Sequence, residues 1–412
     1  MSKKLKIGLI GLGHRGSTLL PTILQIEGVT IAAVCDFYED RRQDAVAKIK
    51  EATGNEPIAT GNYQDILAME NIDAVVASTS WADHVNVAVD AMKAGKYVAT
   101  EVGGAYSIEE CWQLIRTHEE TGVPCMMLEN CCYGREELMV LNMVKKGVFG
   151  EVVHCRGGYQ HDLRDEVVDG RENRHYRLIN YQNRNCDNYP THELGPIAKI
   201  LNINRGNRML SLTSMSSKAA GIHEYILKEK GADYDLANYP FAQGDVVTTM
   251  IKCAHGETIL LTLDTTLPRP YSRGFTVQGT KAIYTEDNKS LFLDELHKDA
   301  HFSWDKHWNN IGEFRKQYDH PIWQNYNPDA DAGHGGMDAL VFRAFFDSVR
   351  RKVQTPIDVY DMAAWMSIST LSEDSIALGG QPVAIPDFTH GRWLHREPAP
   401  EGEYRLDTVS DL

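Results

Sequence analysis

The N-terminal part of the chain alternates between short apolar runs and segments in which apolar residues recur with helical spacing. Apolar runs of strand length occur at residues 6–12 (KIGLIGL), 29–36 (VTIAAVCD), 72–79 (IDAVVAST) and 96–100 (KYVAT). Helical spacing marks the stretches between them, including 17–26 (STLLPTILQI) and 84–95 (HVNVAVDAMKAG). Strands that alternate with helices predict a parallel sheet. We therefore expect a doubly wound α/β domain over residues 1–125.

Period-two alternation dominates the following part of the chain. It occurs at residues 151–159 (EVVHCRGGY), 208–215 (RMLSLTSM), 245–252 (DVVTTMIK), 257–266 (ETILLTLDTT), 273–279 (RGFTVQG) and 281–286 (KAIYTE). Such alternation predicts a largely antiparallel sheet with one covered and one open face. Two helical patterns, 337–352 and 358–378, should pack back on the first domain. We expect residues 126–412 to form an α+β domain, with an irregular insertion at 295–330.

Composition narrows the class of protein. Hydrophobic residues make up 42% of the chain, yet no apolar run is long enough to span a bilayer, so we expect a soluble protein without membrane partners. The basic N-terminus lacks a signal-peptide cleavage pattern, which favours a cytoplasmic location. The 8 cysteines show neither a disulfide framework nor metal-clamp spacing, so we predict reduced thiols and no metal. A net charge of −15, spread along the chain, argues against nucleic acid as a partner and favours a small molecule.

A glycine motif follows the first apolar run. Residues 11–16 read GLGHRG, which is G-x-G-x-x-G between a strand and a helix. Gly11 would permit a tight turn, Gly13 would let the backbone approach a pyrophosphate, and Gly16 would allow close helix packing. His14 and Arg15 lie in the same loop, where the helix N-terminus favours an anion. Any one of these glycines could be only a turn residue, but the strand-helix context favours a Rossmann dinucleotide-binding domain.

Asp36 ends the second predicted strand, about 20 residues beyond the glycine motif. A carboxylate at this position can accept hydrogen bonds from the ribose hydroxyls of the adenosine and repels a 2′-phosphate. The sequence therefore favours NAD over NADP. Arg41 and Arg42 lie close enough in the sequence to leave NADP open.

The order of elements resembles that of the Gfo/Idh/MocA oxidoreductases, with STSWADH after one strand and TEVGGAYSIEE after the next. In that family the second stretch usually carries a Glu-Lys-Pro triplet whose lysine assists hydride transfer, whereas this chain has Glu101, Val102 and Gly103. The rest of the chain resembles a narrower group, the NAD-dependent glycosidases of glycoside hydrolase family 109, known for α-N-acetylgalactosaminidases. The similar stretches include MMLENCCYGREELMVLNMVKKGVFGEVVH, GGYQHDLR, YPTHELGPIAKILNINRGNR, GHGGMD and IPDFTHGRW.

The resemblance implies a redox route to glycoside hydrolysis. Most glycosidases place two carboxylates across the scissile bond, and nothing in this sequence marks such a pair. In the implied route, bound NAD⁺ accepts a hydride from sugar C3, and the resulting ketone acidifies the proton on C2. A base removes that proton, the C1 leaving group departs, water adds to the enone, and the hydride is returned. The substrate would be a glycoside of N-acetylgalactosamine or of another hexopyranose.

The resemblance also implies roles for individual residues. It makes Tyr159, His192, Tyr189 and Glu129 the catalytic candidates, with Tyr159 acting at C2 and His192 beside the C3 hydroxyl. It suggests substrate contacts for Tyr271, His334, His161 and Arg164, and Arg164 or His161 could supply the positive charge that a tyrosine base needs. Ser78, Thr79, Trp81, His84 and Glu101 join the glycine motif and Asp36 as cofactor-binding candidates.

Each assignment has a structural alternative. The turn NYPTHELGP, residues 188–196, could only cap a helix, with His192 bonded to the backbone. Glu129 could be a surface or capping glutamate, Tyr159 a buried phenol, and His334 an ordinary helix start. Three functions compete: a redox glycosidase, an NAD-dependent sugar or inositol dehydrogenase, and a sensor that binds without turnover. The open sheet face further predicts a homodimer or homotetramer.

Overall fold

The computed structural model describes residues 4–300, 302–326 and 333–407, which form two compact units. The first unit contains Met1–Arg135, Pro321–Ala363 and Glu397–Thr408, and the second contains Glu136–His320, Ala364–Arg396 and Val409–Leu412. Most of the polar loop before His334, and the end of the expected insertion, lie outside the described residues.

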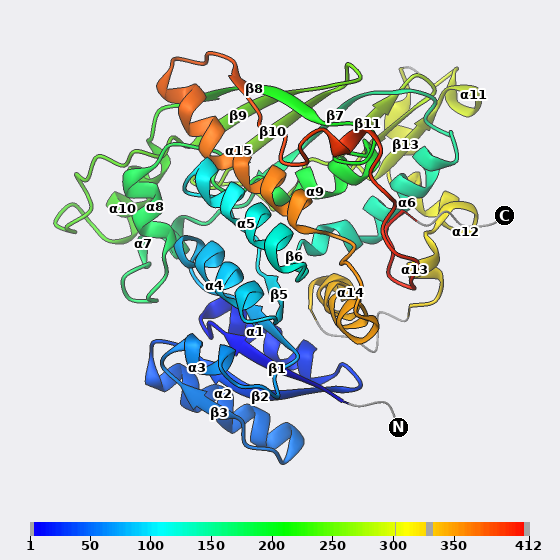
Figure 1. Cartoon of the computed structure of the whole chain (residues 1–412). Coiled ribbons are helices and arrows are strands. Elements are labelled where there is room, and N and C mark those ends of the chain that lie inside the picture. The colour runs from blue at the N-terminus through cyan, green and yellow to red at the C-terminus, as the bar shows by residue number, and fades with distance from the viewer. Residues whose placement is uncertain (1–3, 301, 327–332, 408–412) are drawn as a thin grey trace. The chain divides into compact units, whose positions relative to one another are not determined.

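The first unit is built on a six-stranded sheet with the order β3-β2-β1-β4-β5-β6, and all its pairs are parallel (Figure 1). Its strands are β1 (Leu5–Ile10), β2 (Val29–Cys35), β3 (Ile58–Thr60), β4 (Ala74–Ala77), β5 (Tyr97–Thr100) and β6 (Cys125–Met127). The central strand β4 is buried at every position, as expected for a strand covered on both faces. The predicted doubly wound parallel sheet is confirmed.

Helices cover this sheet in two groups. They are α1 (His14–Leu24), α2 (Glu39–Thr53), α3 (Tyr63–Leu67), α4 (Trp81–Lys93) and α5 (Ile108–Thr121). The helices α1 and α2 pack on each other, as do α4 and α5. The chain runs from β1 outward through β2 to β3, and then returns past β1 to run outward through β4, β5 and β6. Because the two halves run in opposite directions across the sheet, right-handed crossovers place the two helix pairs on opposite faces. This unit also contains the 3-10 helices η1 (Asn130–Tyr133) and η5 (His334–Gly336) and the helix α14 (Met337–Arg351), and α14 packs on α1 and η1.

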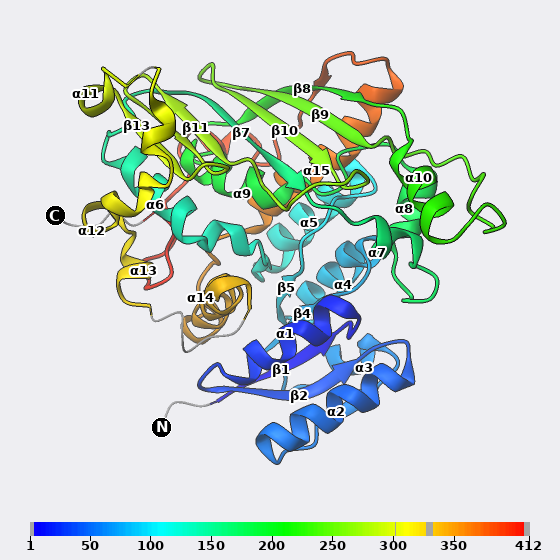
Figure 2. The ribbon, with the colours of Figure 1, turned by 180° about the vertical axis from the view of Figure 1, so that it is seen from behind.

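The second unit contains an eight-stranded sheet with the order β13-β12-β11-β7-β10-β9-β8-β14 (Figure 2). Its strands are β7 (Val152–Gln160), β8 (Met209–Ser216), β9 (Val246–Cys253), β10 (Thr258–Asp264), β11 (Thr276–Gly279), β12 (Ala282–Thr285), β13 (Ser290–Leu293) and β14 (Val383–Ala384). Only β7 and β10 pair in parallel among these strands, so the prediction of a largely antiparallel sheet is confirmed.

The longer helices that lie wholly or mostly in the second unit are α6 (Arg135–Lys145), α7 (Arg164–Val168), α8 (Arg177–Asn183), α9 (Thr191–Ile200), α10 (Gly221–Glu229) and α15 (Val359–Ala377). The helix α9 lies against β7. Within its described residues, the expected insertion holds short helices: α11 (Asp294–His297), η2 (Trp304–His307), η3 (Asn310–Phe314), α12 (Arg315–Tyr318) and α13 (Pro321–Gln324). The 3-10 helix η6 (Arg392–Leu394) follows β14.

Two further sequence predictions can be compared with the fold. All 8 cysteines lie within the described residues, and each is a buried thiol outside any disulfide, as predicted. Among the described helices, none is long and apolar enough to cross a membrane.

Candidate active site

The glycine motif forms a tight loop between β1 and α1. Gly11 has a φ of +90°, and a Cβ atom there would lie 2.5 Å from the carbonyl oxygen of Ser78. A Cβ atom on Gly16 would lie 2.1 Å from the carbonyl oxygen of Gly11. Gly13 is the N-cap of α1 and has no side chain to cover the first amides of the helix. The loop therefore has the close packing and the open helix N-terminus that a pyrophosphate requires.

Asp36 lies directly after β2, as predicted, and is 7% exposed. Its Oδ2 accepts a 2.7 Å hydrogen bond from the backbone N–H of Leu12, and its Oδ1 accepts one of 2.9 Å from that of Tyr38. Asp36 thus holds the glycine loop and the start of α2 in addition to any ribose contact. Arg41 lies 3.8 Å from Oδ2, and Arg42 donates to the backbone carbonyl of Asp36 at 2.8 Å.

Four cofactor-binding candidates follow β4. Ser78 and Thr79 lie in the loop, and Trp81 and His84 are buried residues at the start of α4. Trp81 is 2% exposed and lies so close to Gly103 that a Cβ atom there would be 2.4 Å from the indole ring. The Nε2 atom of His84 bonds to the backbone carbonyl of Thr79 at 3.1 Å. Burial lowers the pKa of His84 to about 4, so its neutral ring donates to that carbonyl. Trp81 and His84 are therefore buried residues that pack against neighbouring loops, whereas Ser78 and Thr79 lie at the carboxyl end of β4.

Arg15 belongs to a hydrogen-bond network within the first unit. Its Nε donates to Glu101 at 3.2 Å, and its terminal nitrogens donate to the two oxygens of Asp338 at 3.1 and 2.8 Å. Asp338 also accepts from Asn130 at 2.8 Å and contacts the Nδ1 of His334 at 2.8 Å. Burial alone would raise the pKa of Asp338, but His334 and Arg15 hold it well below its usual range. The predicted cofactor residues Arg15 and Glu101 are thereby joined to His334, a predicted substrate residue.

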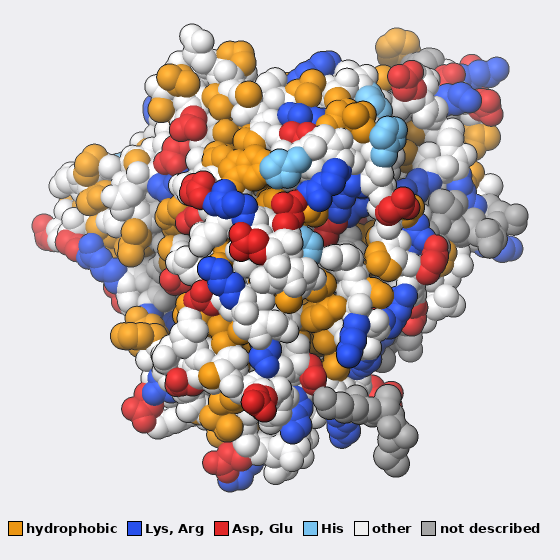
Figure 3. Space-filling view, viewed as in Figure 1, with side chains coloured by type: hydrophobic (Ala, Val, Ile, Leu, Met, Phe, Trp, Pro, Cys, Tyr) orange, Lys and Arg blue, Asp and Glu red, His pale blue; other side chains and the backbone are white. Residues whose placement is uncertain are grey.

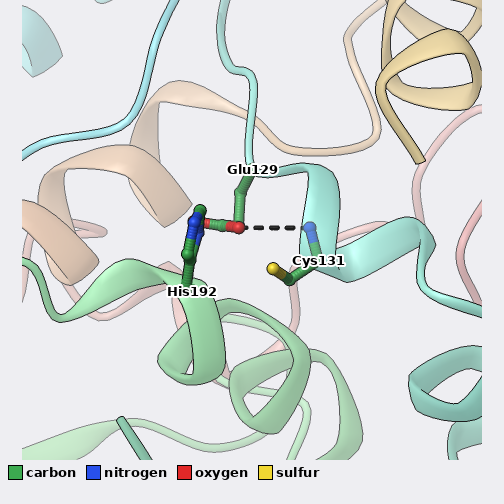
Figure 4. A group of neighbouring side chains, drawn as sticks. All are labelled: Glu129, Cys131 and His192. Atoms are coloured by element: carbon green, nitrogen blue, oxygen red, sulfur yellow. Dashed lines mark hydrogen bonds between the residues drawn. The ribbon is translucent and has the colours of Figure 1, made fainter. Parts of the chain in front are cut away.

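Glu129 follows β6 and is fully buried. Its Oε1 accepts a 3.2 Å hydrogen bond from the backbone N–H of Cys131, which makes it the N-cap of η1 (Figure 4). One carboxylate oxygen of Glu129 therefore caps a helix, as the structural alternative expected. Because Glu129 is buried, it is not a surface glutamate. Figure 4 also labels His192, which comes from the first turn of α9.

Four predicted aromatic residues of the second unit form one cluster. Tyr159 lies at its centre, with ring centroids 4.4 Å from Tyr189, 5.4 Å from His192 and 6.3 Å from Tyr271. Tyr159 and Tyr189 are 7% and 8% exposed, whereas Tyr271 is 52% exposed. Residues from β7, from the start of α9 and from the loop after β10 are thus brought together although they are far apart in the sequence.

His161 gives Tyr159 a proton acceptor. The Tyr159 hydroxyl and the Nδ1 atom of His161 are 2.9 Å apart, and the His161 ring also lies 5.1 Å from that of Tyr271. Burial, together with the positive charge of Arg177, lowers the pKa of His161. A neutral imidazole at Nδ1 can accept the hydrogen bond that the phenol donates. Tyr159 therefore has the partner that a tyrosine acting in proton transfer needs.

The positive charge beside Tyr159 comes from Arg177, which the sequence analysis did not select. Its guanidinium carbon lies 5.1 Å from the ring centre of Tyr189 and 6.0 Å from that of Tyr159. Burial would lower the pKa of Arg177, but Glu166 and Tyr159 raise it above its usual value, so the group stays charged. A buried guanidinium favours the ionised form of a neighbouring phenol.

Arg164 has a different environment from the one predicted. Its guanidinium makes a bidentate pair with Asp162, at 2.8 and 2.7 Å, and lies over the ring of Tyr225. Its charge is thus compensated by a neighbouring carboxylate. The expectation of a positive charge close to Tyr159 is better met by Arg177, because a long side chain can come from a segment that sequence spacing does not single out.

The turn before α9 is fixed by buried polar groups. Asn188 donates to the side chain of Gln243 at 3.2 Å, and the backbone of Asp187 bonds to Ser372 and Ser369 at 2.8 and 2.7 Å. The N-cap of α9 is Pro190, which makes no side-chain capping bond. The capping alternative for this turn therefore lacks the side-chain cap that it assumed.

Comparisons with known proteins agree with this geometry. Residues 5–129 match the oxidoreductase family with an NAD-binding Rossmann fold, and residues 133–395 match the C-terminal domain of glycosyl hydrolase 109. The chain is 42% identical to an α-N-acetylgalactosaminidase of Tannerella forsythia, with 96% of this chain and 88% of that protein covered. It is 40% identical to a glycosyl hydrolase family 109 protein of Parabacteroides distasonis, with 96% and 89% covered.

Solved structures show the same fold at low identity. A levoglucosan dehydrogenase in complex with NADH and levoglucosan has a TM-score of 0.69 and 16% identity, with 93% of this chain and 100% of that chain covered. The myo-inositol 2-dehydrogenase of Lactobacillus plantarum has a TM-score of 0.66 and 15% identity, with the same coverage. These solved structures show the fold alone. The relatives at 40% identity or more, with the match to the C-terminal domain of the family, show that the chain belongs to glycosyl hydrolase family 109.

Proposed function

We propose that this protein is an NAD-dependent glycosidase that releases α-linked N-acetylgalactosamine from a small glycoside. The observation that carries the proposal is the cluster of Tyr159, Tyr189 and His192 around a buried arginine, in a chain of this family. The name of the Tannerella forsythia relative supports the choice of sugar. No pair of facing carboxylates is needed for this chemistry, which distinguishes it from ordinary acid/base glycosidases.

The first unit fits a dinucleotide. The backbone of Gly11, Gly13 and His14 would hold the pyrophosphate, and the carboxylate of Asp36 would accept hydrogen bonds from the adenosine ribose. The negative charge of Asp36 supports NAD over NADP. Arg41 lies beside the Asp36 carboxylate, and Arg42 donates to the Asp36 backbone carbonyl, so both arginines already have a partner. When bound, NAD⁺ supplies a hydride acceptor at sugar C3 and a hydride donor later in the same turnover.

The second unit supplies proton transfer in this proposal. His192, with Tyr189 beside it, accepts the proton of the C3 hydroxyl as C3 is oxidised. Tyr159 then removes the C2 proton, with His161 as its hydrogen-bond partner and Arg177 stabilising the phenolate. Loss of the C2 proton lets the C1 substituent leave, and water adds at C1 in its place. Tyr271 and Arg164 of the same unit orient the sugar. In the first unit, Glu129 is proposed as a further catalytic residue and His334 as a further substrate contact.

A sugar or inositol dehydrogenase is the second candidate function. The solved dehydrogenases share the fold, but at 15–16% identity they support no choice of reaction. Val102 is 4% exposed and lies where the wider superfamily usually has a lysine, so the amine of that mechanism is missing. A sensor without turnover is disfavoured because Tyr159, His161 and His192 remain together.

A panel of nitrophenyl glycosides, assayed with and without added NAD⁺, tests the proposal. We expect cleavage of the α-N-acetylgalactosaminide with no net production of reduced cofactor. The β-anomer and the α-galactoside serve as controls for the anomer and for the N-acetyl group. Reduced cofactor released in proportion to the sugar consumed would replace the glycosidase with the dehydrogenase.

Three further features belong to the proposal. The chain divides into a cofactor-binding domain at 1–125 and a substrate domain at 126–412, and it works as a homodimer or homotetramer. The cytoplasmic location agrees with the free state of the 8 cysteines. Cell fractionation would test this location.

A further inference from the structure

A single guanidinium within the second unit joins four elements around the substrate residues. Arg273 lies on the loop after β10, two residues beyond Tyr271, and its side chain is 13% exposed. Its Nη2 atom is 2.5 Å from a carboxylate oxygen of Glu137 in α6 and 3.1 Å from one of Glu286, which follows β12. Its Nε atom is 3.3 Å from Glu193, the residue after His192 in α9.

The three carboxylates are removed from solvent. The side chains of Glu193, Glu137 and Glu286 are 0%, 4% and 16% exposed. With every group ionised, one positive charge would face three negative charges, which is costly in a buried place. Burial raises the pKa of Glu137, while Arg273 opposes that shift. Arg273 is therefore essential to the charge balance of this cluster, and a planar fork suits it better than a point charge does.

The cluster supports the substrate residues from behind. A Cβ atom on Gly157, two residues before Tyr159, would lie 2.4 Å from the Cβ of Glu193, so β7 and α9 are in direct contact at this point. On the other side, Glu286 accepts a 3.0 Å hydrogen bond from the backbone N–H of Phe275 and so fixes the end of the Tyr271 loop. The same contacts that hold Arg273 thus set the distance between the loop and the start of α9.

We propose that Arg273 is a positioning residue that holds Tyr271 beside Tyr159 and His161, and its loop in place relative to the start of α9, through its ion pair with Glu193. Arg273 does not touch the sugar in this proposal. It fixes where the half-exposed ring of Tyr271 stands beside the buried rings of the cluster. The inference rests on the proposed function only in assigning a substrate contact to Tyr271.

Arg273→Lys tests the inference, because lysine keeps the charge but cannot fork toward several carboxylates. We expect KM for the cleaved glycoside to rise about tenfold, with a smaller change in kcat and no change in NAD⁺ affinity. The matched control is Arg269→Lys on the same loop, where Arg269 pairs with Asp264 at 2.6 Å and not with α9. KM should change less than about twofold in that control. Equal effects of the two substitutions would overturn the proposal.

A double-mutant cycle separates positioning from general stability. If Arg273 acts through Tyr271, Arg273→Lys should cost little more once Tyr271→Ala has removed the ring. Full additivity of the two effects on KM would show that Arg273 acts elsewhere. Should Arg273→Lys not fold, Glu286→Gln removes one anchor of the same guanidinium and should raise KM by a few fold, and an unchanged KM would contradict the proposal.

Hydrogen exchange gives a readout that does not depend on catalysis. Arg273→Lys should speed amide exchange in both the loop 265–274 and the start of α9, whereas Arg269→Lys should leave α9 unchanged. Unaltered exchange in α9 would overturn the link between the two segments. If the wild type cleaves no glycoside but the two variants show this difference in exchange, the proposed function fails while the link between the loop and α9 stands.

Discussion

At the residue scale, the proposal assigns two proton transfers to two different residues, His192 and Tyr159, the latter paired with His161. His192 would act at C3 before Tyr159 can act at C2, because the C2 proton becomes acidic only after oxidation. Tyr159→Phe should therefore still give the absorbance of reduced nicotinamide when sugar is added, but exchange the C2 hydrogen with deuterated solvent about 10²- to 10⁴-fold more slowly. His192→Ala should show neither signal.

Two controls accompany this prediction. Melting curves establish that both variants fold, and Arg171→Lys, which alters an exposed arginine paired with Asp235, should retain both signals. A His192→Ala variant that folds and keeps nearly full glycosidase activity would reduce the turn before α9 to a structural role. Loss of both signals in Tyr159→Phe would move that residue to the oxidation step.

Asp187 predicts a pH dependence of stability. Burial raises the pKa of Asp187 from 3.8 to about 7, although the backbone N–H of Tyr189 opposes the shift. The folded protein thus binds this proton more tightly than the unfolded chain does. Its contribution to the unfolding free energy is present below about pH 4 and is lost as the pH rises to about 7.

Asp187→Asn removes this titration. Relative to the wild type, the variant should therefore gain unfolding free energy between pH 5 and pH 8, by up to about 4 kcal/mol. Urea denaturation at several pH values measures the difference. The exposed Asp233→Asn is the control, because its surroundings change little on unfolding. Parallel curves for wild type and Asp187→Asn would refute the prediction.

The sequence predicts a candidate site residue only where that residue belongs to a motif of fixed spacing or to a stretch that resembles a known family. Gly11, Gly16 and Asp36 were found because their spacing follows from the strand-turn-helix geometry itself. The aromatic cluster was found by resemblance to a family. Arg177 and Arg273 were missed, since a long charged side chain on an irregular segment gives no periodic signal and its partners come from distant parts of the chain.

At the element scale, prediction succeeded where one face of an element is buried. Most strands of both sheets are predicted by their apolar periods. In β9, for example, the positions alternate between buried and exposed along most of the strand. The helix α2 was not expected, because only Ala45 and Ile49 of its 15 residues are buried. Short elements such as β13 and α7 carry too few residues for a period to show.

The contact between β7 and α9 at Gly157 gives an element-scale prediction. Gly157→Ala would place a Cβ atom 2.4 Å from the Cβ of Glu193 and 2.8 Å from its Cγ. The helix must shift to relieve this overlap, so we expect a loss of about 1–3 kcal/mol in unfolding free energy and reduced activity as His192 moves. Gly312→Ala, where no atom lies within 4 Å of the added carbon, is the matched control. Equal stability of the two variants would show that α9 yields without cost.

At the scale of the whole molecule, surface charge is mixed on the face that Figure 3 shows, with acidic and basic side chains side by side. The net charge is −15, and this face carries no broad basic area. A small glycoside, which needs no concentrated field to bind, is consistent with such a surface.

The open face of the second sheet bears on assembly. Cross-strand rows on this face run through Leu260, Met250 and Thr213, and through Thr262, Thr248 and Met215. Met215 and Met250 are 61% and 41% exposed, so both apolar side chains are open to solvent on this face. Aligned apolar and threonine side chains on a flat strand surface suit a two-fold interface, in which the same face serves both subunits.

We therefore expect a homodimer, or a tetramer built from such dimers, and light scattering at micromolar concentration measures it. Met250→Glu should give monomers, because two carboxylates would meet in the middle of a desolvated interface. Leu227→Glu on α10, where the leucine is 50% exposed, introduces the same charge away from the sheet and should leave the assembly intact. A wild type that is monomeric, or a Met250→Glu variant that still pairs, would show that another surface, or none, joins the subunits.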